Sequence, residues 1–291
     1  MARIAICAVT VLLLVLPLSV SAAEEHRHVY LLMGQSNMVG RGEMTRWPAH
    51  PRVFSFNKAG KWIPAVDPLH ETSSRDRVGP GVSFGRGMLH VVDQGITIGL
   101  VPSAVGGSPL SRWEKGGDLY EATVRRAREA TKRGELSGIL WMQGEKDAKD
   151  LALAKSYAKR LDGMILDLRR ELGLPELPFV AALPCVELAE RDDRPGAELV
   201  SESLKGLPRR VQHTATVDSA GLKSTGDQTH FSTPSQRELG GRYAEAMATL
   251  LGYDAVEIPD GSCPYRTPEA WRQAVPAKYQ RRPEYAFVEA D

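Results

Sequence analysis

The chain is poor in cysteine and lacks the short motifs that hold metals or nucleotides. It has three cysteines in 291 residues, and no Cys-x-x-Cys or His-Glu-x-x-His motif occurs. After the apolar run at residues 29–33, the Gly-x-Gly-x-x-Gly spacing of a dinucleotide site is absent, as is the Gly-Lys-Ser/Thr of a phosphate-binding loop. We therefore expect no metal and no organic cofactor.

The chain also lacks an excess of either charge. Lysine and arginine number 37 against 36 aspartate and glutamate residues, a formal net charge of +1. Such a balance provides no excess of positive charge that would attract nucleic acid or an anionic membrane. Internal repeats and low-complexity segments are missing too. Nucleic acid is therefore not an expected partner, and nothing in the sequence implies a protein partner.

Long hydrophobic runs are absent except at the N-terminus. Arg3 precedes an apolar run at residues 4–20, and Ser-Ala-Ala follows at residues 21–23. This order is typical of a secretory signal peptide, here residues 1–23. The run falls short of the roughly 20 residues that span a bilayer, so we expect cleavage and no stable membrane insertion. The sequence predicts an exported protein, periplasmic or extracellular.

Export makes a disulfide feasible between the two cysteines outside this segment. Cys7 leaves with the signal peptide, and Cys185 and Cys263 remain. Thiols of exported proteins can pair. Their separation in sequence says nothing about geometry, so the pairing stays open.

Short apolar runs alternate with helical patterns along the rest of the chain. The runs are nearly continuous, as in strands covered on both faces, and lie at residues 29–33, 96–101, 138–142, 179–183 and 214–217. Helical spacing of apolar residues occupies residues 119–130, 153–172 and 239–251. This alternation predicts an α/β fold, a three-layer α/β/α sandwich around a five-stranded parallel sheet.

The predicted domain covers residues 24–252. Its last helix has a start signal, with Thr233 as N-cap, Pro234 at the first helical position and Gln236 completing a capping box. Residues 41–80 show no strong periodicity and are predicted to form a long loop region. Residues 253–291 contain several prolines and are predicted to form an extension that wraps the surface.

The residues after the first apolar run point to a nucleophile. Residues 34–38 read Gly-Gln-Ser-Asn-Met, which places Ser36 at the exit of a predicted buried strand. Open α/β folds bind ligands at that edge of the sheet. Two interpretations remain open for this segment alone, a nucleophile elbow or an ordinary strand-ending turn.

A serine hydroxyl needs a base, and His230 is the best placed of the seven histidines. It lies between the fifth apolar run and the last helix, at the same predicted sheet edge as Ser36. Asp227, three residues earlier, can hold the required imidazole tautomer. Asp227 can instead cap a turn beside a surface histidine, but the serine at the same edge favours a catalytic pair.

Two further strand exits offer hydrogen-bond donors for an oxyanion. Gly106 and Gly107 follow the second apolar run, and Gln143 follows the third. Backbone N–H groups and amide side chains stabilise the charge that develops in acyl transfer. Tight turns between strand and helix explain the glycines equally well.

These segments resemble a known family. Residues 34–42, Gly-Gln-Ser-Asn-Met-Val-Gly-Arg-Gly, resemble the first block of the sialate O-acetylesterase and acetylxylan-esterase branch of the SGNH hydrolases. Similar blocks follow in order at residues 79–84, 106–108, 143–145 and 227–231. The resemblance spans nearly all of residues 29–251. It implies a flavodoxin-like SGNH-hydrolase fold and an esterase acting on O-acetylated carbohydrate.

The resemblance also implies a role for each site residue. Ser36 is the nucleophile, His230 the base and Asp227 its orienter. The N–H groups of Ser36 and Gly106 and the side chain of Gln143 are the implied oxyanion donors, although the sequence does not decide between Gly106 and Gly107. Three further residues, Arg41, Gly107 and Glu145, are candidates for support of the site or for substrate binding.

Three other functions account for part of the same sequence pattern. A lipase-type α/β-hydrolase is disfavoured because its Gly-x-Ser-x-Gly elbow has Met38 in the last position here. A non-catalytic carbohydrate-binding protein has no need for Ser36, Asp227 and His230 together. A thioesterase or lysophospholipase stays open as an alternative serine hydrolase. The sequence thus predicts an exported serine esterase that removes acetyl groups from a carbohydrate.

Overall fold

The computed structural model describes residues 26–45 and 47–254. The predicted signal peptide, Cys263 and nearly all of the predicted C-terminal extension therefore lie outside the described residues. Within them, no helix combines the length and the apolar character needed to cross a bilayer.

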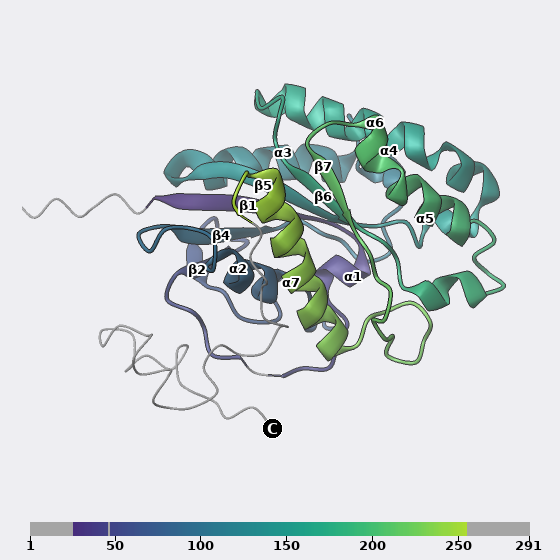
Figure 1. Cartoon of the computed structure of the whole chain (residues 1–291), viewed down its shortest axis with the longest axis horizontal. Coiled ribbons are helices and arrows are strands. Elements are labelled where there is room, and N and C mark those ends of the chain that lie inside the picture. Colours follow the sequence, from purple (N-terminus) through teal and green to yellow (C-terminus); the bar gives the residue numbers. More distant parts are fainter. Residues whose placement is uncertain (1–25, 46, 255–291) are drawn as a thin grey trace, which may run out of the picture.

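A sheet of seven strands forms the centre of the molecule (Figure 1), in the order β3-β2-β4-β1-β5-β6-β7. The five predicted strands are all present and pair in parallel. They are β1 (Arg27–Gly34), β4 (Thr97–Pro102), β5 (Glu135–Met142), β6 (Phe179–Ala182) and β7 (Thr214–Val217). Their carboxyl ends meet at one edge, which positions the site described below.

The sheet has two strands more than the predicted five. β2 (Val53–Phe56) runs parallel to β4, and β3 (Trp62–Pro64) pairs antiparallel with β2. Both fall in the segment predicted to be a long loop. The sequence does not predict them because both are short, four and three residues long, and neither has a continuous apolar run. Of the two, only β3 lies at the edge of the sheet. Contacts with the neighbouring strands stabilise them instead. For example, the ring of Trp62 in β3 packs against Gly99 of β4.

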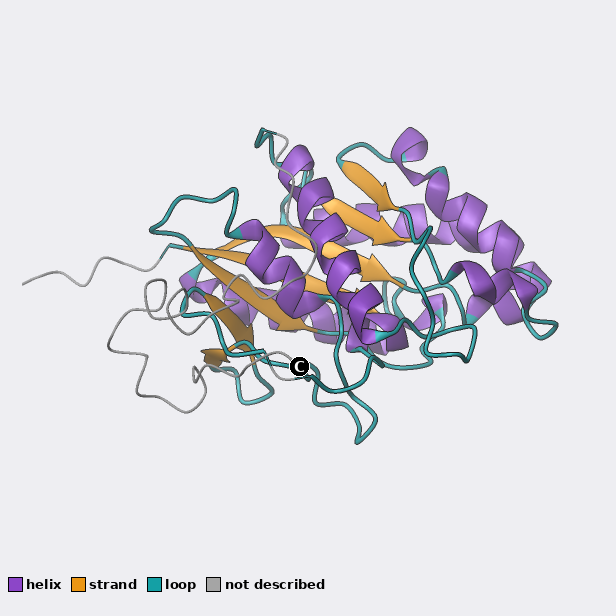
Figure 2. Ribbon diagram, turned by 60° about the horizontal axis from the view of Figure 1, so that its bottom comes forward, coloured by secondary structure: helices purple, strands orange, loops and turns teal. Residues whose placement is uncertain are grey.

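Helices cover both faces of the sheet, which confirms the predicted three-layer sandwich (Figure 2). On β1, Val29, Leu31 and Met33 face one helical layer, and Tyr30 and Leu32 face the other. The first layer contains α3 (Asp118–Ala130), α4 (Leu151–Leu172), α5 (Ala197–Lys205) and α6 (Leu207–Arg210). The second contains α2 (Gly81–Met88) and α7 (Thr233–Leu250).

The connections include one short α-helix and four single turns of 3₁₀ helix. The α-helix is α1 (Ser36–Val39). The 3₁₀ turns are η1 (Leu110–Arg112), η2 (Thr131–Arg133), η3 (Asp147–Lys149) and η4 (Val186–Glu190).

The start of α7 differs in detail from the predicted capping box. Ser232 is the N-cap, Thr233 is already helical, and no side chain caps the helix. Gln236 is fully buried and its amide donates to the carbonyl of Asn37 at 3.2 Å. Gln236, which was predicted to complete a capping box within α7, instead joins α7 to the turn that follows β1.

Candidate active site

The turn after β1 presents Ser36 in a conformation that requires glycine before it. Gly34 has a φ of +126°, and a Cβ there would lie 2.1 Å from the carbonyl oxygen of Met142. The next N–H, that of Gln35, donates to the same carbonyl at 2.8 Å. Ser36 then begins α1 and is 7% exposed. The close approach of β1 to β5 thus fixes the serine at the carboxyl edge of the sheet.

The loop between β7 and α7 brings His230 to this serine. Nε2 of His230 lies 2.9 Å from Oγ of Ser36, although the two residues are 194 positions apart. Nδ1 of the same ring lies 2.5 Å from Oδ2 of Asp227. Because a carboxylate only accepts, Nδ1 carries the proton and Nε2 is left to accept the serine hydroxyl proton. The three residues predicted from sequence therefore form one chain of hydrogen bonds.

Asp227 both caps a turn and holds the imidazole. Its Oδ1 accepts from the backbone N–H groups of Thr229 at 2.9 Å and His230 at 2.8 Å. Burial raises the pKa of the Asp227 carboxyl, but the hydrogen bonds from the backbone and ring of His230 outweigh it, and this pKa lies below its ordinary value. The carboxylate is therefore ionised at neutral pH, ready to stabilise an imidazolium beside it.

A hydrogen bond and an unusual backbone conformation shape the loop that carries Asp227 and His230. Arg191 donates from Nη1 to the carbonyl of Asp227 at 2.9 Å. Gln228, between the pair, has a φ of +57°, a left-handed conformation that is uncommon outside glycine. This residue turns the chain tightly enough for the carboxylate to meet the imidazole three positions on.

Asn37 joins the serine turn to the histidine loop, a role that the sequence analysis did not assign. Its Nδ2 donates to Oε1 of Glu145 at 2.6 Å and to the carbonyl of Thr229 at 2.9 Å. Its Oδ1 accepts from the N–H of Phe231 at 3.1 Å. The side chain is fully buried, so these bonds replace water. Its place directly after Ser36 is the one sequence signal for this role.

We expect Asn37→Ala to lower both stability and turnover. Alanine leaves three groups without their hydrogen-bond partner, at a cost of about 1–3 kcal/mol each, so the free energy of unfolding should fall by at least about 3 kcal/mol. Loss of the link between the two loops should lower kcat by about 10²-fold. Urea denaturation and hydrolysis of p-nitrophenyl acetate measure the two effects.

Asn57→Ala is the matched control for Asn37→Ala. Asn57 Oδ1 accepts from the Lys61 N–H in an exposed turn, so its loss should leave kcat unchanged. A wild-type kcat in Asn37→Ala would contradict the positioning role of Asn37.

Glu145 lies behind the serine turn and does not contact Ser36 or His230 by a hydrogen bond in the described structure. It is buried, and burial raises the pKa of its carboxyl more than the hydrogen bonds from its own backbone and from Asn37 lower it. Its Oε2 has no hydrogen-bond partner among the described residues. This placement favours the supporting role over a direct contact with substrate.

Gly106 is the glycine that lies beside Ser36. A Cβ on Gly106 would be 3.9 Å from the Cβ of Ser36, whereas a Cβ on Gly107 would meet nothing within 4 Å. The N–H of Val105 donates to the carbonyl of Gly34 at 3.0 Å, which ties this loop to the serine turn. The N–H groups of Ser36 and Gly106 have no partner among the described residues. Both are therefore available to an anionic oxygen.

Gln143 differs from the expectation that its amide is an oxyanion donor. Its Nε2 donates to Oδ2 of Asp147 at 2.6 Å and to the carbonyl of Ser108 at 3.2 Å. Its Oε1 accepts from the hydroxyl of Tyr157 at 2.9 Å. Both amide hydrogens are thus engaged inside the protein. Gln143 instead ties the end of β5 to the loop that carries Gly106.

Arg41 occupies the gap between that glycine and an acidic turn. Its guanidinium would lie 2.8 Å from a Cβ on Gly106, and Nη1 lies 3.6 Å from Oδ1 of Asp76. Nη1 also donates to the carbonyl of Gly40 at 2.7 Å. These contacts favour bracing of the site over a free substrate-binding cation.

The sequence and the fold are both similar to those of known carbohydrate esterases. Residues 26–249 match the protein family described as carbohydrate esterase, sialic acid-specific acetylesterase. A protein of Arabidopsis thaliana named probable carbohydrate esterase is 33% identical over 239 residues, which cover 75% of this chain and 89% of that protein.

Solved structures of other proteins share this fold. An X-ray structure of an Arabidopsis thaliana protein superposes with a TM-score of 0.69 at 31% identity, covering 77% of this chain and 98% of the other. The crystal structure of NanS superposes with a TM-score of 0.64 at 19% identity, covering 78% and 98%.

Proposed function

This chain belongs to the carbohydrate-esterase family of sialic acid-specific acetylesterases, and from that premise we propose that it is a serine esterase that removes O-acetyl groups from a carbohydrate. The observation that carries the proposal is the hydrogen-bonded series from Ser36 through His230 to Asp227, with distances of 2.9 and 2.5 Å. These are the distances at which a base can take a proton from its nucleophile.

In the proposed reaction, Oγ of Ser36 attacks the acetyl carbonyl carbon while Nε2 of His230 accepts the hydroxyl proton. The ionised Asp227 stabilises the imidazolium that results. The tetrahedral oxyanion is held by the N–H groups of Ser36 and Gly106, which are preorganised for a charge that develops only in the transition state.

Collapse of this intermediate breaks the bond to the sugar oxygen. His230 gives its proton to that departing oxygen, and the acetyl group stays on Ser36 as an ester. A water molecule then attacks the acetyl carbonyl while His230 accepts one of its protons. Protonation of the Ser36 oxygen by the same imidazole releases acetate and restores the starting state.

Two other functions on the same fold predict different behaviour. A non-catalytic carbohydrate-binding protein would retain ligand without turnover, and an ionised Asp227 paired with His230 is superfluous for that task. A thioesterase or lysophospholipase would prefer long acyl chains. Acetyl preference is supported by the family to which the chain belongs.

We further propose that the protein acts after export, as either a periplasmic or an extracellular enzyme. The support is the charged start, apolar run and small residues of segment 1–23. An O-acetylated glycan outside the cytoplasm is then the substrate. N-terminal sequencing of the secreted protein tests this proposal, and a start near residue 24 is the expected result.

Acetate release from a panel of acetylated glycans tests the activity. The panel contains O-acetylated sialic acid, acetylated xylan and p-nitrophenyl esters of increasing chain length. We expect acetate from at least one glycan and the fastest turnover on the acetyl ester. Fastest turnover on a long acyl chain would favour the lysophospholipase alternative, and no turnover on any member would favour the binding protein.

A further inference from the structure

A second group of chemically active side chains lies at the edge of the sheet opposite Ser36. His28 is on β1 and His26 directly precedes that strand, so the two project to the same side because strand side chains alternate. Glu135 opens β5 and pairs in register with His28. From His28 to the end of β1 is about 20 Å at about 3.3 Å per residue, which separates this group from the catalytic residues.

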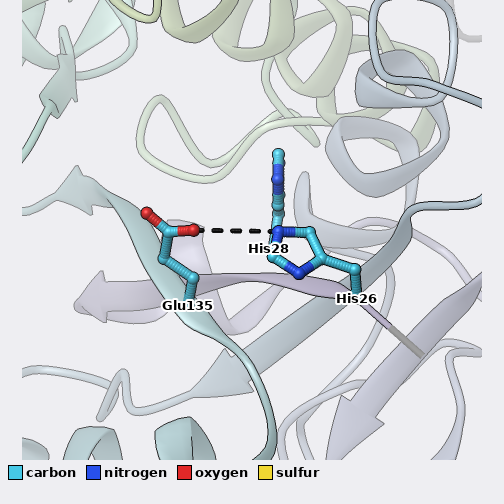
Figure 3. Close-up of side chains that lie close together, drawn as sticks. All are labelled: His26, His28 and Glu135. Carbon is cyan, nitrogen blue, oxygen red and sulfur yellow. Dashed lines mark ion pairs between the residues drawn. The ribbon is translucent and has the colours of Figure 1, made fainter. Parts of the chain in front are cut away.

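The three side chains converge in a geometry suited to one cation (Figure 3). One ligand atom of each lies within 4.8 Å of the others, and Nε2 of His26 is 3.8 Å from Oε2 of Glu135. In a tetrahedral site with bonds of about 2.0–2.2 Å, neighbouring donor atoms lie about 3.3–3.6 Å apart. The side chains of His26 and Glu135 are 63% and 69% exposed, so they are free to rotate. Small rotations can shorten the distances between donor atoms to those of a bound ion.

His28 is the most restricted of the three side chains. It is partly buried, and its Nδ1 is buried without a hydrogen-bond partner among the described residues. An unpaired imidazole nitrogen in such a position is costly, and a cation coordinated through Nδ1 would remove that cost.

We propose that His26, His28 and Glu135 bind one divalent transition-metal ion, with Zn²⁺ as the preferred ion and water completing the coordination. Two imidazoles and a carboxylate suit Zn²⁺, whereas Ca²⁺ and Mg²⁺ favour sets made of oxygen alone. The ion joins the start of β1 to β5 and takes no part in ester hydrolysis. The expectation of no metal rested on sequence motifs, and no motif marks this site because Glu135 joins the two histidines only through the pairing of β1 with β5.

Titration of the protein with Zn²⁺ tests the site. The protein must carry no histidine tag, because a tag binds the same metal. Calorimetry and metal analysis after dialysis should give one Zn²⁺ per chain, and the melting temperature should rise with Zn²⁺ concentration. His26→Asn and Glu135→Gln, both at exposed positions, should each weaken binding by at least about 10-fold.

Glu176→Gln is the matched control for Glu135→Gln. Glu176 is also an exposed carboxylate next to a histidine, 3.8 Å from His213, and it has no place in the proposed site. Its Zn²⁺ affinity should equal that of the wild type. Removal of Zn²⁺ by EDTA should lower the melting temperature and leave the rate of ester hydrolysis unchanged.

Three results would overturn the proposal. They are the absence of stoichiometric Zn²⁺ binding, wild-type affinity in both ligand variants, and an equal loss of affinity in Glu176→Gln. A fall in hydrolysis on chelation would overturn the assignment of the ion to a purely structural role.

Discussion

Ser36→Ala is expected to abolish ester hydrolysis while leaving the protein folded. Loss of a serine nucleophile lowers kcat by a factor on the order of 10⁶. Oγ of Ser36 has only one hydrogen-bond partner among the described side chains, Nε2 of His230, so its removal leaves little buried polarity unpaired. The free energy of unfolding should therefore change by less than about 1.5 kcal/mol. Hydrolysis of p-nitrophenyl acetate and urea denaturation measure the two quantities.

Ser103→Ala is the control for this substitution. Ser103 follows β4 at the same edge of the sheet, and its hydroxyl contacts only the carbonyl of Val101, at 3.4 Å, among the described residues. It should retain wild-type turnover. If Ser36→Ala hydrolyses the acetyl ester at a rate comparable to that of the wild type, Ser36 is not the nucleophile.

Asp227→Asn should lower kcat by about 10⁴-fold, because the amide selects the wrong tautomer of His230. Oδ1 of Asp227 accepts from the N–H groups of Thr229 and His230, and the asparagine oxygen must keep that position. The amide nitrogen then faces Nδ1 of His230 and donates to it. The imidazole proton moves to Nε2, which no longer accepts from Ser36.

A second variant and the value of KM make this prediction specific. Asp192→Asn changes the same functional group at an exposed position in a nearby loop and should have no effect. KM for p-nitrophenyl acetate should change little in Asp227→Asn, because the lost interaction belongs to the reaction and not to binding. An unchanged kcat would remove Asp227 from the site.

The central sheet and the pairing of distant residues could be predicted because both follow from local patterns. Each of β1, β4, β5, β6 and β7 is a short apolar run, and parallel strands end at a common edge. That rule alone placed Ser36 and His230 at one edge. It required no knowledge of the loops between them.

Other features could not be predicted because they depend on contacts between distant segments. β2 is held by pairing with β4, and β3 by pairing with β2, not by apolar runs of their own. Gln143 has the residue type of an oxyanion donor, but Asp147 and Ser108 engage its amide. Gln236 matches a capping pattern yet donates to Asn37. In each case the partner, rather than the residue type, decides the role.

Covalent labelling tests the central claim most directly, since it identifies the nucleophile by its bond. The protein is treated with an organophosphate ester, and the adduct is located by mass spectrometry of the intact chain and of its peptides. We expect one phosphoryl group on Ser36, with parallel loss of activity, no adduct in Ser36→Ala and much slower labelling in His230→Ala. Inactivation with the adduct on another residue, or full activity after labelling of Ser36, would contradict the account.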